Sequence, residues 1–249
     1  GSDGHVKITT EGSERLRIQS DGDVGIGTID NTNNERLRIQ DDASTSTVCQ
    51  VSIISGSAER SILNFGDKED PNIGRVSYHN NTNTISLFTN NTERLIINSY
   101  GLVSAPFQYH LHAQRSNDQT GYNAQGDFGV PMIFNQIVSE TKDSSLSSCF
   151  NTSTGVFTAP VLGLYHFCAA TYSSGNSVFS QSWFTLNGSR AAGTDWHLSS
   201  SNYPFVNNNQ VIRLAAGNTV GFKPYASGQS NLTLSANANH TFFKVTLIG

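Results

Sequence analysis

Charged side chains are scarce in this 249-residue chain, and long apolar runs are missing from it. Asp, Glu, Lys and Arg make up 14% of the residues, and the formal net charge is −4 at pH 7. The 15 Lys and Arg are scattered rather than clustered, which argues against a basic surface for DNA or RNA. No run of about 18 apolar residues occurs, so we expect no insertion into a membrane.

Cysteine is also scarce, with only Cys49, Cys149 and Cys168 in the chain. Their odd number and wide spacing fit neither a disulfide framework nor a zinc site, whose cysteine ligands come in closely spaced pairs. We therefore expect three free thiols that are buried in the protein.

Asn, Ser, Thr and Gly are abundant instead, and a short motif repeats. The hexamer "ERLRIQ" occurs at 14–19 and 35–40, and a looser copy, "ERLIIN", occurs at 93–98. Around the first copy, the apolar residues Leu16, Ile18, Val24 and Ile26 fall at alternate positions on either side of a Ser-Asp-Gly-Asp turn. This pattern predicts a short hairpin that is apolar on one face.

Such a hairpin is marginal in water and needs neighbours to cover its apolar face. Between the copies, "TVCQVSIISG", "SILNFG", "GRVSYHN" and "TISLFTN" each predict a further short strand. Repetition along one chain supplies neighbours end to end, and symmetry between chains supplies them sideways. We predict that residues 1–105 form a β-repeat stalk in which three chains intertwine as a homotrimer.

The longer pattern "ERLRIxSDGxVGIGT" resembles repeats of phage tail-fibre and related tail proteins, where they occur shortly before the distal domain. The resemblance covers about a dozen residues in each copy. It implies a viral protein that is assembled in the cytoplasm of a host bacterium and works outside the cell, on the virion. Its partners would then include the remaining tail-fibre and tail proteins.

From Pro106 onward aromatic residues become frequent and helical periodicity is absent, so this half is also predicted to be all-β. The stretch "NTSTGVFTAPVLGLYHF" at 151–167 resembles the signature of the complement C1q-like globular head. The matching positions are Gly155, Phe157, Pro160, Gly163, Tyr165 and Phe167. "PMIFNQI", "WFTLNG", "IRLAAGNTVGF" and "HTFFKVTLI" follow the family's order, although Lys244 stands where the family usually has Gly.

This resemblance implies a ten-stranded jelly roll of the C1q/TNF type over residues 106–249, which forms trimers through a flat apolar contact, often at the end of a stalk. Tyr165 and Phe167 lie on one side of their predicted strand, where Phe157 and Phe222 can meet them. We expect these rings to form the core and not a binding surface.

Catalytic chemistry is not indicated. The acids of this half, Asp118, Asp127, Glu140, Asp143 and Asp195, stand mostly among turn residues, without a paired carboxylate or a nucleophile beside a base. We expect solvated turn acids and no enzyme.

The candidate ligand-binding residues are Asp195, Trp196 and His197 in "TDWHL", together with Tyr203 and Tyr225 in two loop-like stretches, "NYPFVNNN" and "PYASGQSN". An indole can stack on a sugar while polar groups fix its hydroxyls. A structural role for this tryptophan, packed under a loop at a strand end, stays open.

A possible metal site is formed by His110 and His112, which fall on one face of an extended strand. Around a threefold axis the pair becomes six imidazoles, enough for octahedral iron or another transition metal, and phage fibres are known for His-x-His ion sites. The pair could equally face solvent. Calcium is not predicted, because no acidic cluster occurs, and no other cofactor is expected.

Together these features predict a distal tail-fibre tip that acts as a receptor-binding adhesin for a host surface polysaccharide or lipopolysaccharide. Because the surface is expected to be neutral and polar, a sugar is favoured over a protein receptor. Three alternatives remain open: a trimerisation knob that nucleates folding of the fibre, a secreted C1q-like lectin, and a depolymerase.

Overall fold

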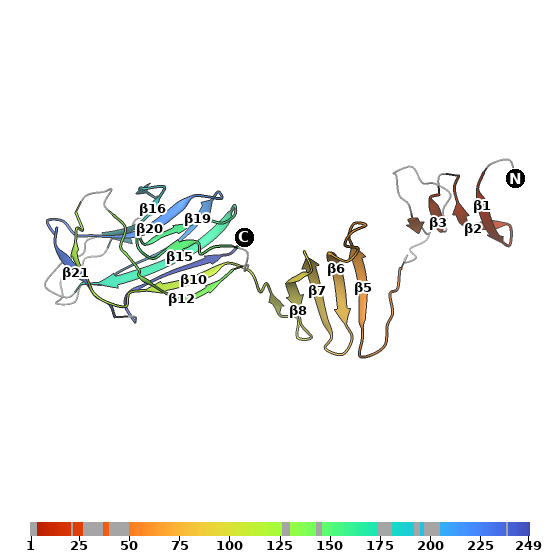
Figure 1. Cartoon of the computed structure of the whole chain (residues 1–249), viewed down its shortest axis with the longest axis horizontal. Coiled ribbons are helices and arrows are strands. Elements are labelled where there is room, and N and C mark those ends of the chain that lie inside the picture. Colours follow the sequence, from red (N-terminus) through yellow and green to blue (C-terminus); the bar gives the residue numbers. More distant parts are fainter. Residues whose placement is uncertain are drawn as a thin grey trace.

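The computed structural model describes residues 4–20, 22–26, 37–39, 50–125, 130–142, 146–173, 181–191, 195–196, 205–237 and 239–249, with only the backbone at 38, 195 and 196. Every regular element in these residues is a β-strand, which confirms the predicted all-β class. No described segment is a helix long and apolar enough to cross a membrane. Figure 1 shows three groups of strands that follow one another along the longest axis.

Sheet 1 lies nearest the N-terminus and contains β1 (Val6–Thr10), β2 (Ser13–Ile18), β3 (Val24–Ile26) and β4 (Leu37–Ile39). The strands pair in this order, antiparallel except for β3 and β4, which run parallel. The first repeat copy thus folds back on itself through β2 and β3, with Leu16 opposite Ile26. Three residues of the second copy form β4.

Sheet 2 is an antiparallel meander of β5 (Arg60–Phe65), β6 (Gly74–His79), β7 (Thr84–Thr89), β8 (Thr92–Ile97) and β9 (Val103–Ser104). Its strands include three of the four stretches between the repeats that were predicted to be strands. The fourth prediction, for 47–56, is wrong where the structure describes it, because residues 50–55 belong to no strand. Strand propensity alone is not sufficient where no neighbouring strand supplies backbone hydrogen bonds.

The first and third repeat copies use the same turn. In the first, Gln19 N donates to Asp23 O over 2.8 Å and Gly22 N donates to Gln19 O over 3.0 Å. In the third, Asn98 N donates to Leu102 O and Gly101 N donates to Asn98 O, over 3.0 and 2.9 Å. Gly22 and Gly101 have φ values of 89° and 77°, a left-handed conformation that favours glycine.

The structural repeat is longer than the sequence motif, because the preceding strand also matches. Both β1–β2 and β7–β8 shift register two residues before the turn, between Ile8 and Thr9 and between Leu87 and Phe88. Each pair then closes through a two-residue turn with positive φ, at 11–12 and at 90–91. The repeating unit is therefore a three-stranded element, of which the sequence signals only the last two strands.

The head, defined here as residues 107–249, contains one five-stranded and one six-stranded antiparallel sheet. Sheet 3 has the order β12-β10-β22-β15-β19, with bounds Gln136–Thr141, His110–Gln114, Phe242–Leu247, Gly163–Tyr172 and Phe205–Leu214. Sheet 4 has the order β13-β14-β20-β16-β17, with bounds Phe150–Asn151, Val156–Thr158, Thr219–Tyr225, Gln181–Leu186 and Ser189–Arg190. The short β18 (Asp195–Trp196) pairs with β16, and β11 (Gln119–Tyr122) pairs with β21 (Leu232–Leu234).

The strand order of the head is that of a jelly roll. From β14 to β22 the main strands alternate between the two sheets, and the first strand, β10, lies beside the last, β22, in sheet 3. This arrangement brings the two sheets face to face. It confirms the fold class that the sequence predicted for this half. The domain limits at 1–105 and 106–249 stay a prediction.

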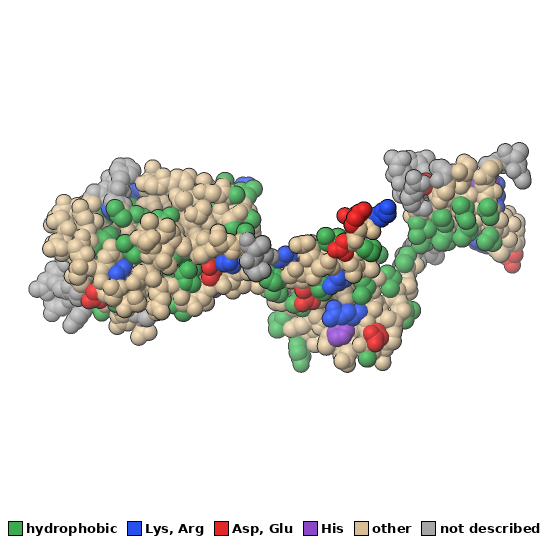
Figure 2. All heavy atoms as spheres, in the orientation of Figure 1, with side chains coloured by type: hydrophobic (Ala, Val, Ile, Leu, Met, Phe, Trp, Pro, Cys, Tyr) green, Lys and Arg blue, Asp and Glu red, His purple; other side chains and the backbone are tan. Residues whose placement is uncertain are grey.

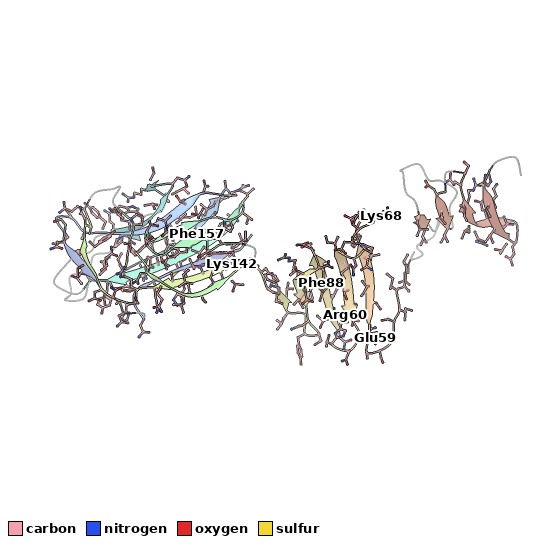
Figure 3. All side chains as sticks on the ribbon, in the orientation of Figure 1. Glu59, Arg60, Lys68, Phe88, Lys142 and Phe157 are labelled. Carbon is pink, nitrogen blue, oxygen red and sulfur yellow. The ribbon has the colours of Figure 1, made fainter. Side chains whose placement is uncertain are left out.

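The core of the head is built from aromatic rings. Phe157, labelled in Figure 3, is fully buried, and its ring centroid lies 5.4–5.7 Å from those of Tyr109, Tyr165 and Phe167. Phe222 joins the same core but contacts Phe134 and Phe184 instead. The predicted core residues are therefore buried together, as expected.

Candidate functional site

Sheet 1 has one apolar face that nothing in the described chain covers. The pairing register aligns Val6, Ile18, Val24 and Leu37 in one row, and Ile8, Leu16, Ile26 and Ile39 in the next. Six of these eight side chains are exposed. Figure 2 shows the resulting apolar band.

The opposite face of sheet 1 is polar. Arg17 donates to both carboxylate oxygens of Glu14, over 2.5 and 2.7 Å, and Lys7 lies 3.8 Å from the same carboxylate. The hydrogen bond from Arg17 holds the pKa of Glu14 below its usual value. Sheet 1 is therefore a single layer with one water-compatible face and one apolar face.

Sheet 2 repeats this division of its faces. One row consists of Leu63, Val76, Leu87 and Leu95, and the next contains Tyr78, Ile85, Ile97 and Val103. Most of these side chains are exposed or half-buried, and Leu87 on the inner strand β7 is 41% exposed. On the other face, Arg75 covers the ring of Phe88 at 3.9 Å, while charged side chains lie over this sheet in Figure 2. On the apolar face, none of the residues that the structure describes provides such a cover.

The predicted ligand-binding residues are only partly described. Asp195 and Trp196 form β18, with Trp196 opposite Gln181, and Gln181 lies opposite Tyr225 on its other side. The register therefore places residues 196, 181 and 225 in one row across sheet 4. His197 and Tyr203 lie outside the described residues, so a shared site with them stays a prediction.

The loop prediction for Tyr225 and for 202–209 is wrong where the structure describes it. Tyr225 ends the strand β20, half-buried, and its ring lies 5.5 Å from that of the buried Trp183. Residues 205–209 belong to β19. The buried Asn208 donates to Ser182 O over 2.9 Å, which satisfies the amide nitrogen of a residue type that usually favours loops.

His110 and His112 both lie in β10, on the face of sheet 3 that points away from the core, opposite Thr246 and Lys244. Burial, followed by the charges of Lys244 and His110, lowers the pKa of His112. A neutral imidazole can bind a metal, but the neighbouring ammonium group opposes a cation. The described residues contain no group of three or more potential metal ligands, and a metal at this pair stays a prediction.

Of the acids considered for catalysis, Glu140 and Asp118 have described side chains, and both have structural roles. Glu140 lies in β12 and accepts hydrogen bonds from Tyr109 Oη at 2.9 Å, Cys149 N at 3.1 Å and Ser148 Oγ at 3.2 Å. It is therefore not the solvated turn acid that the sequence suggested. Asp118 accepts a hydrogen bond from Ala236 N over 2.7 Å. Asp127 and Asp143 lie outside the described residues.

Cys149 and Cys168 are free, as predicted, but they are half-buried and not buried. Burial raises the pKa of both thiols, so both are protonated near neutral pH. Neither has the lowered pKa of a reactive cysteine. Cys49 lies outside the described residues.

A pocket that the sequence did not signal lies at one end of sheet 3. It has a volume of about 440 Å³, and its described lining consists of Tyr172, Phe205, Asn237 and His240. Tyr172 ends β15, Phe205 begins β19, and the two residues are paired across the sheet. His240 stands nearly perpendicular to both rings, at centroid distances of 5.6 and 6.3 Å. We call this the tip pocket.

The tip pocket lies at the end of the head that is remote from sheets 1 and 2. Strand β15 begins beside the C-terminus, where Leu164 N donates to Gly249 O, and it runs away from the other sheets (Figure 1). Tyr172 is its last residue. A ligand in this pocket would therefore meet the farthest part of the head.

Similarity to known proteins is found among solved structures. No protein-family model matches this chain, and no curated protein sequence matches it. Among solved structures, it is similar to the globular domain of zebrafish complement 1qA protein, with 22% identity and a TM-score of 0.41. It is also similar to murine APRIL and to the Eiger TNF of S. frugiperda, each with 12% identity and a TM-score of 0.40.

Each comparison covers 57% of this chain, and respectively 98%, 99% and 92% of the other protein. At TM-scores near 0.4 these similarities add no further conclusion. The chain is an all-β protein, and the strand order of its C-terminal part is by itself that of a jelly roll.

Proposed function

We propose that this chain is the distal part of a phage tail fibre, and that it attaches the virion to its host by binding a surface polysaccharide or lipopolysaccharide without cleaving it. In this proposal three copies assemble side by side. Sheets 1 and 2 form the stalk, and three jelly rolls form the tip. The remaining tail proteins hold the other end of the fibre.

The observation that carries the proposal is the uncovered apolar face of sheets 1 and 2. An apolar face of this kind is costly in water, since burying one large aliphatic side chain stabilises a protein by about 1.5–3 kcal/mol. Sheet 2 alone aligns eight apolar residues on that face. Because no described segment of the chain covers this face, a further covering layer is the physical requirement.

Two further copies of the same chain meet this requirement. Copies related by a closed rotation present the same face to a common axis, so their apolar rows bury one another while the polar faces stay in water. Sheet 1 and sheet 2 each have one apolar and one polar face. If the apolar faces of both sheets point to the same axis, the three chains form a continuous shaft. The jelly roll at its end is then displayed three times.

A sugar receptor is supported by the neutral, polar composition and by the aromatic pocket at the remote end of the head. Weak sites on three rigidly joined heads can act together, because the first contact raises the effective concentration of the others. Adhesion of this kind needs no bond cleavage.

Two measurements test the proposal. Analytical ultracentrifugation should give three times the 26.9 kDa mass of the chain; a monomer or a dimer contradicts the assembly. Flow cytometry of fluorescently labelled protein on a panel of bacterial strains should show saturable binding to one or a few of them. A folded trimer that binds no strain in a broad panel, with a known phage host included, would count against adhesion.

A structural role for the head is the second candidate, and the distribution of the core favours it. All residues of the buried core cluster belong to 109–245, so the head can fold on its own contacts while sheets 1 and 2 cannot. Residues 1–105 produced alone discriminate the two functions. They stay unfolded if the head nucleates the trimer, and they fold without binding cells if the head is only the adhesin.

A further inference from the structure

We propose that the tip pocket is a receptor subsite that holds one neutral sugar ring of the host polysaccharide. The inference rests on the proposed function, and it assigns receptor binding to Tyr172, Phe205, Asn237 and His240. None of these four residues is among the ligand-binding residues predicted from the sequence. The pocket volume of about 440 Å³ falls within the usual range for small-molecule sites, about 300–1,000 Å³.

The lining suits a sugar because it combines aromatic rings with one amide and no carboxylate, lysine or arginine among the described residues. Aromatic faces carry negative potential and attract the C–H groups on the apolar side of a pyranose ring. Phe205 is 40% exposed, and Tyr172 is half-buried beside it, so both offer ring surface to a ligand. A charged ligand finds no fixed counter-charge there.

The amide of Asn237 is oriented by its own turn. Its side-chain oxygen accepts a hydrogen bond from Asn239 N over 3.0 Å, and its backbone oxygen accepts from His240 N and Thr241 N over 2.9 and 2.8 Å. The side-chain nitrogen donates to no acceptor in the described part of the chain. It is therefore a placed donor that a sugar hydroxyl can use.

The same turn is attached to the sheet, so the pocket is preformed. Ser235 N donates to Tyr172 O over 3.0 Å, and Ser173 forms an isolated bridge with Leu234. Asp118 accepts from Ala236 N and also holds the turn. Because His240 and Asn237 are fixed against the ends of β15 and β19, little conformational entropy is lost when a ligand binds.

The first test uses the full chain and three variants. Phe205→Ala removes an exposed aromatic ring of the pocket, Phe205→Tyr keeps it, and Val211→Ala is the control. Val211 lies on the same strand and the same face and is 55% exposed. The probe is an immobilised panel of lipopolysaccharides and capsular polysaccharides purified from bacterial strains.

On a polysaccharide that binds the parent chain, Phe205→Ala should weaken binding by about tenfold or more, because the loss at each site is multiplied across the joined copies. Phe205→Tyr and Val211→Ala should bind as the parent does. Full binding by Phe205→Ala would overturn the subsite while leaving adhesion intact. Sedimentation of all four proteins completes the test, since a loss of oligomer in Phe205→Ala alone would make the pocket a contact between copies and overturn the inference.

A second measurement separates the subsite from the function. Saturation-transfer NMR with methyl glycosides of glucose, galactose, mannose and N-acetylglucosamine should give a signal that Phe205→Ala loses and Val211→Ala keeps. If the parent chain gives this NMR signal but binds no immobilised polysaccharide, the result supports the sugar subsite and contradicts adhesion to those polymers. If the parent chain gives neither the NMR signal nor polysaccharide binding, both proposals are overturned.

Discussion

The head and sheet 2 are built from the same local elements, yet one of them closes its own core and the other does not. Both are antiparallel, and in both the apolar side chains alternate along the strands with polar ones. In the head, Phe157 is fully buried between two sheets of one chain, whereas Leu87 on sheet 2 remains 41% exposed. The alternation of apolar and polar side chains thus specifies which face of a sheet must be buried. It does not specify whether the residues that bury this face come from the same chain.

Placing a charge on the apolar face of sheet 2 gives the largest expected effect. Leu87→Asp would put three carboxylates into a dry contact around one axis, at a cost of several kcal/mol per copy. We expect the trimer to be lost at micromolar concentration in sedimentation equilibrium. Asn64→Asp is the matched control, since Asn64 is exposed on the opposite face. An unchanged mass for Leu87→Asp would mean that this face is not the contact.

A pair of glycines with similar φ gives the next comparison. Gly155 in the head has φ 71°, and a Cβ there would lie 1.9 Å from Met132 O. Gly101 in sheet 2 has φ 77°, and a Cβ would meet nothing within 4 Å. Gly155→Ala should therefore lower the free energy of unfolding by more than about 4 kcal/mol, and Gly101→Ala by about 1–2 kcal/mol.

Urea denaturation of both glycine variants, each beside the parent protein, measures this difference. The strain of a left-handed alanine is common to the two sites, so the excess at Gly155 reports the backbone contact alone. Equal losses would show that the segment around Met132 can move aside.

Strand positions could largely be predicted from the sequence, because "SILNFG", "GRVSYHN" and "TISLFTN" carry strong alternation between turn residues. The errors have a common cause in tertiary structure. Val51, Ile53 and Ile54 have high strand propensity but no paired strand, and Asn208 has low propensity but a buried hydrogen bond to Ser182. The local sequence pattern indicates strand propensity, but a segment becomes a strand only where another strand is available to pair with it.

The tip pocket was beyond prediction for a similar reason. Tyr172, Phe205 and His240 are each separated by more than thirty positions, and only the pairing of β15 with β19 and the turn at 235–241 bring them together. An isolated aromatic residue gives no signal for such a site. By contrast, "TDWHL" attracted the prediction because its polar and aromatic residues are neighbours in sequence.

A smaller effect is expected from truncating the core. Phe157→Ala should lower the free energy of unfolding of the head by about 3–5 kcal/mol, because a buried ring in contact with Tyr109, Tyr165 and Phe167 leaves a cavity. Val161→Ala, at an exposed side chain between β14 and β15, should cost less than about 1 kcal/mol. Chemical denaturation followed by tryptophan fluorescence measures both, since Trp183 is buried in the head. A similar loss in the two variants would contradict a closed core.

The smallest effect is a dependence on alkaline pH. Burial, and then the charge of Glu140 and its 2.9 Å hydrogen bond, raise the pKa of Tyr109 above its usual value near 10. A folded-state pKa above the unfolded one contributes stability that is fully present below about pH 10 and is lost as pH rises further, by up to about 1.4 kcal/mol per pH unit.

Urea midpoints at pH 9, 10 and 11 compare the parent with Tyr109→Phe. The variant should lose stability less steeply above pH 10, and Glu140 keeps its partners Ser148 and Cys149 there, so no unpaired carboxylate complicates the difference. Tyr100→Phe is the control in the turn between β8 and β9, where the side chain is 87% exposed. If both variants follow the parent at all three pH values, the buried Tyr109–Glu140 pair does not couple the fold of the head to pH.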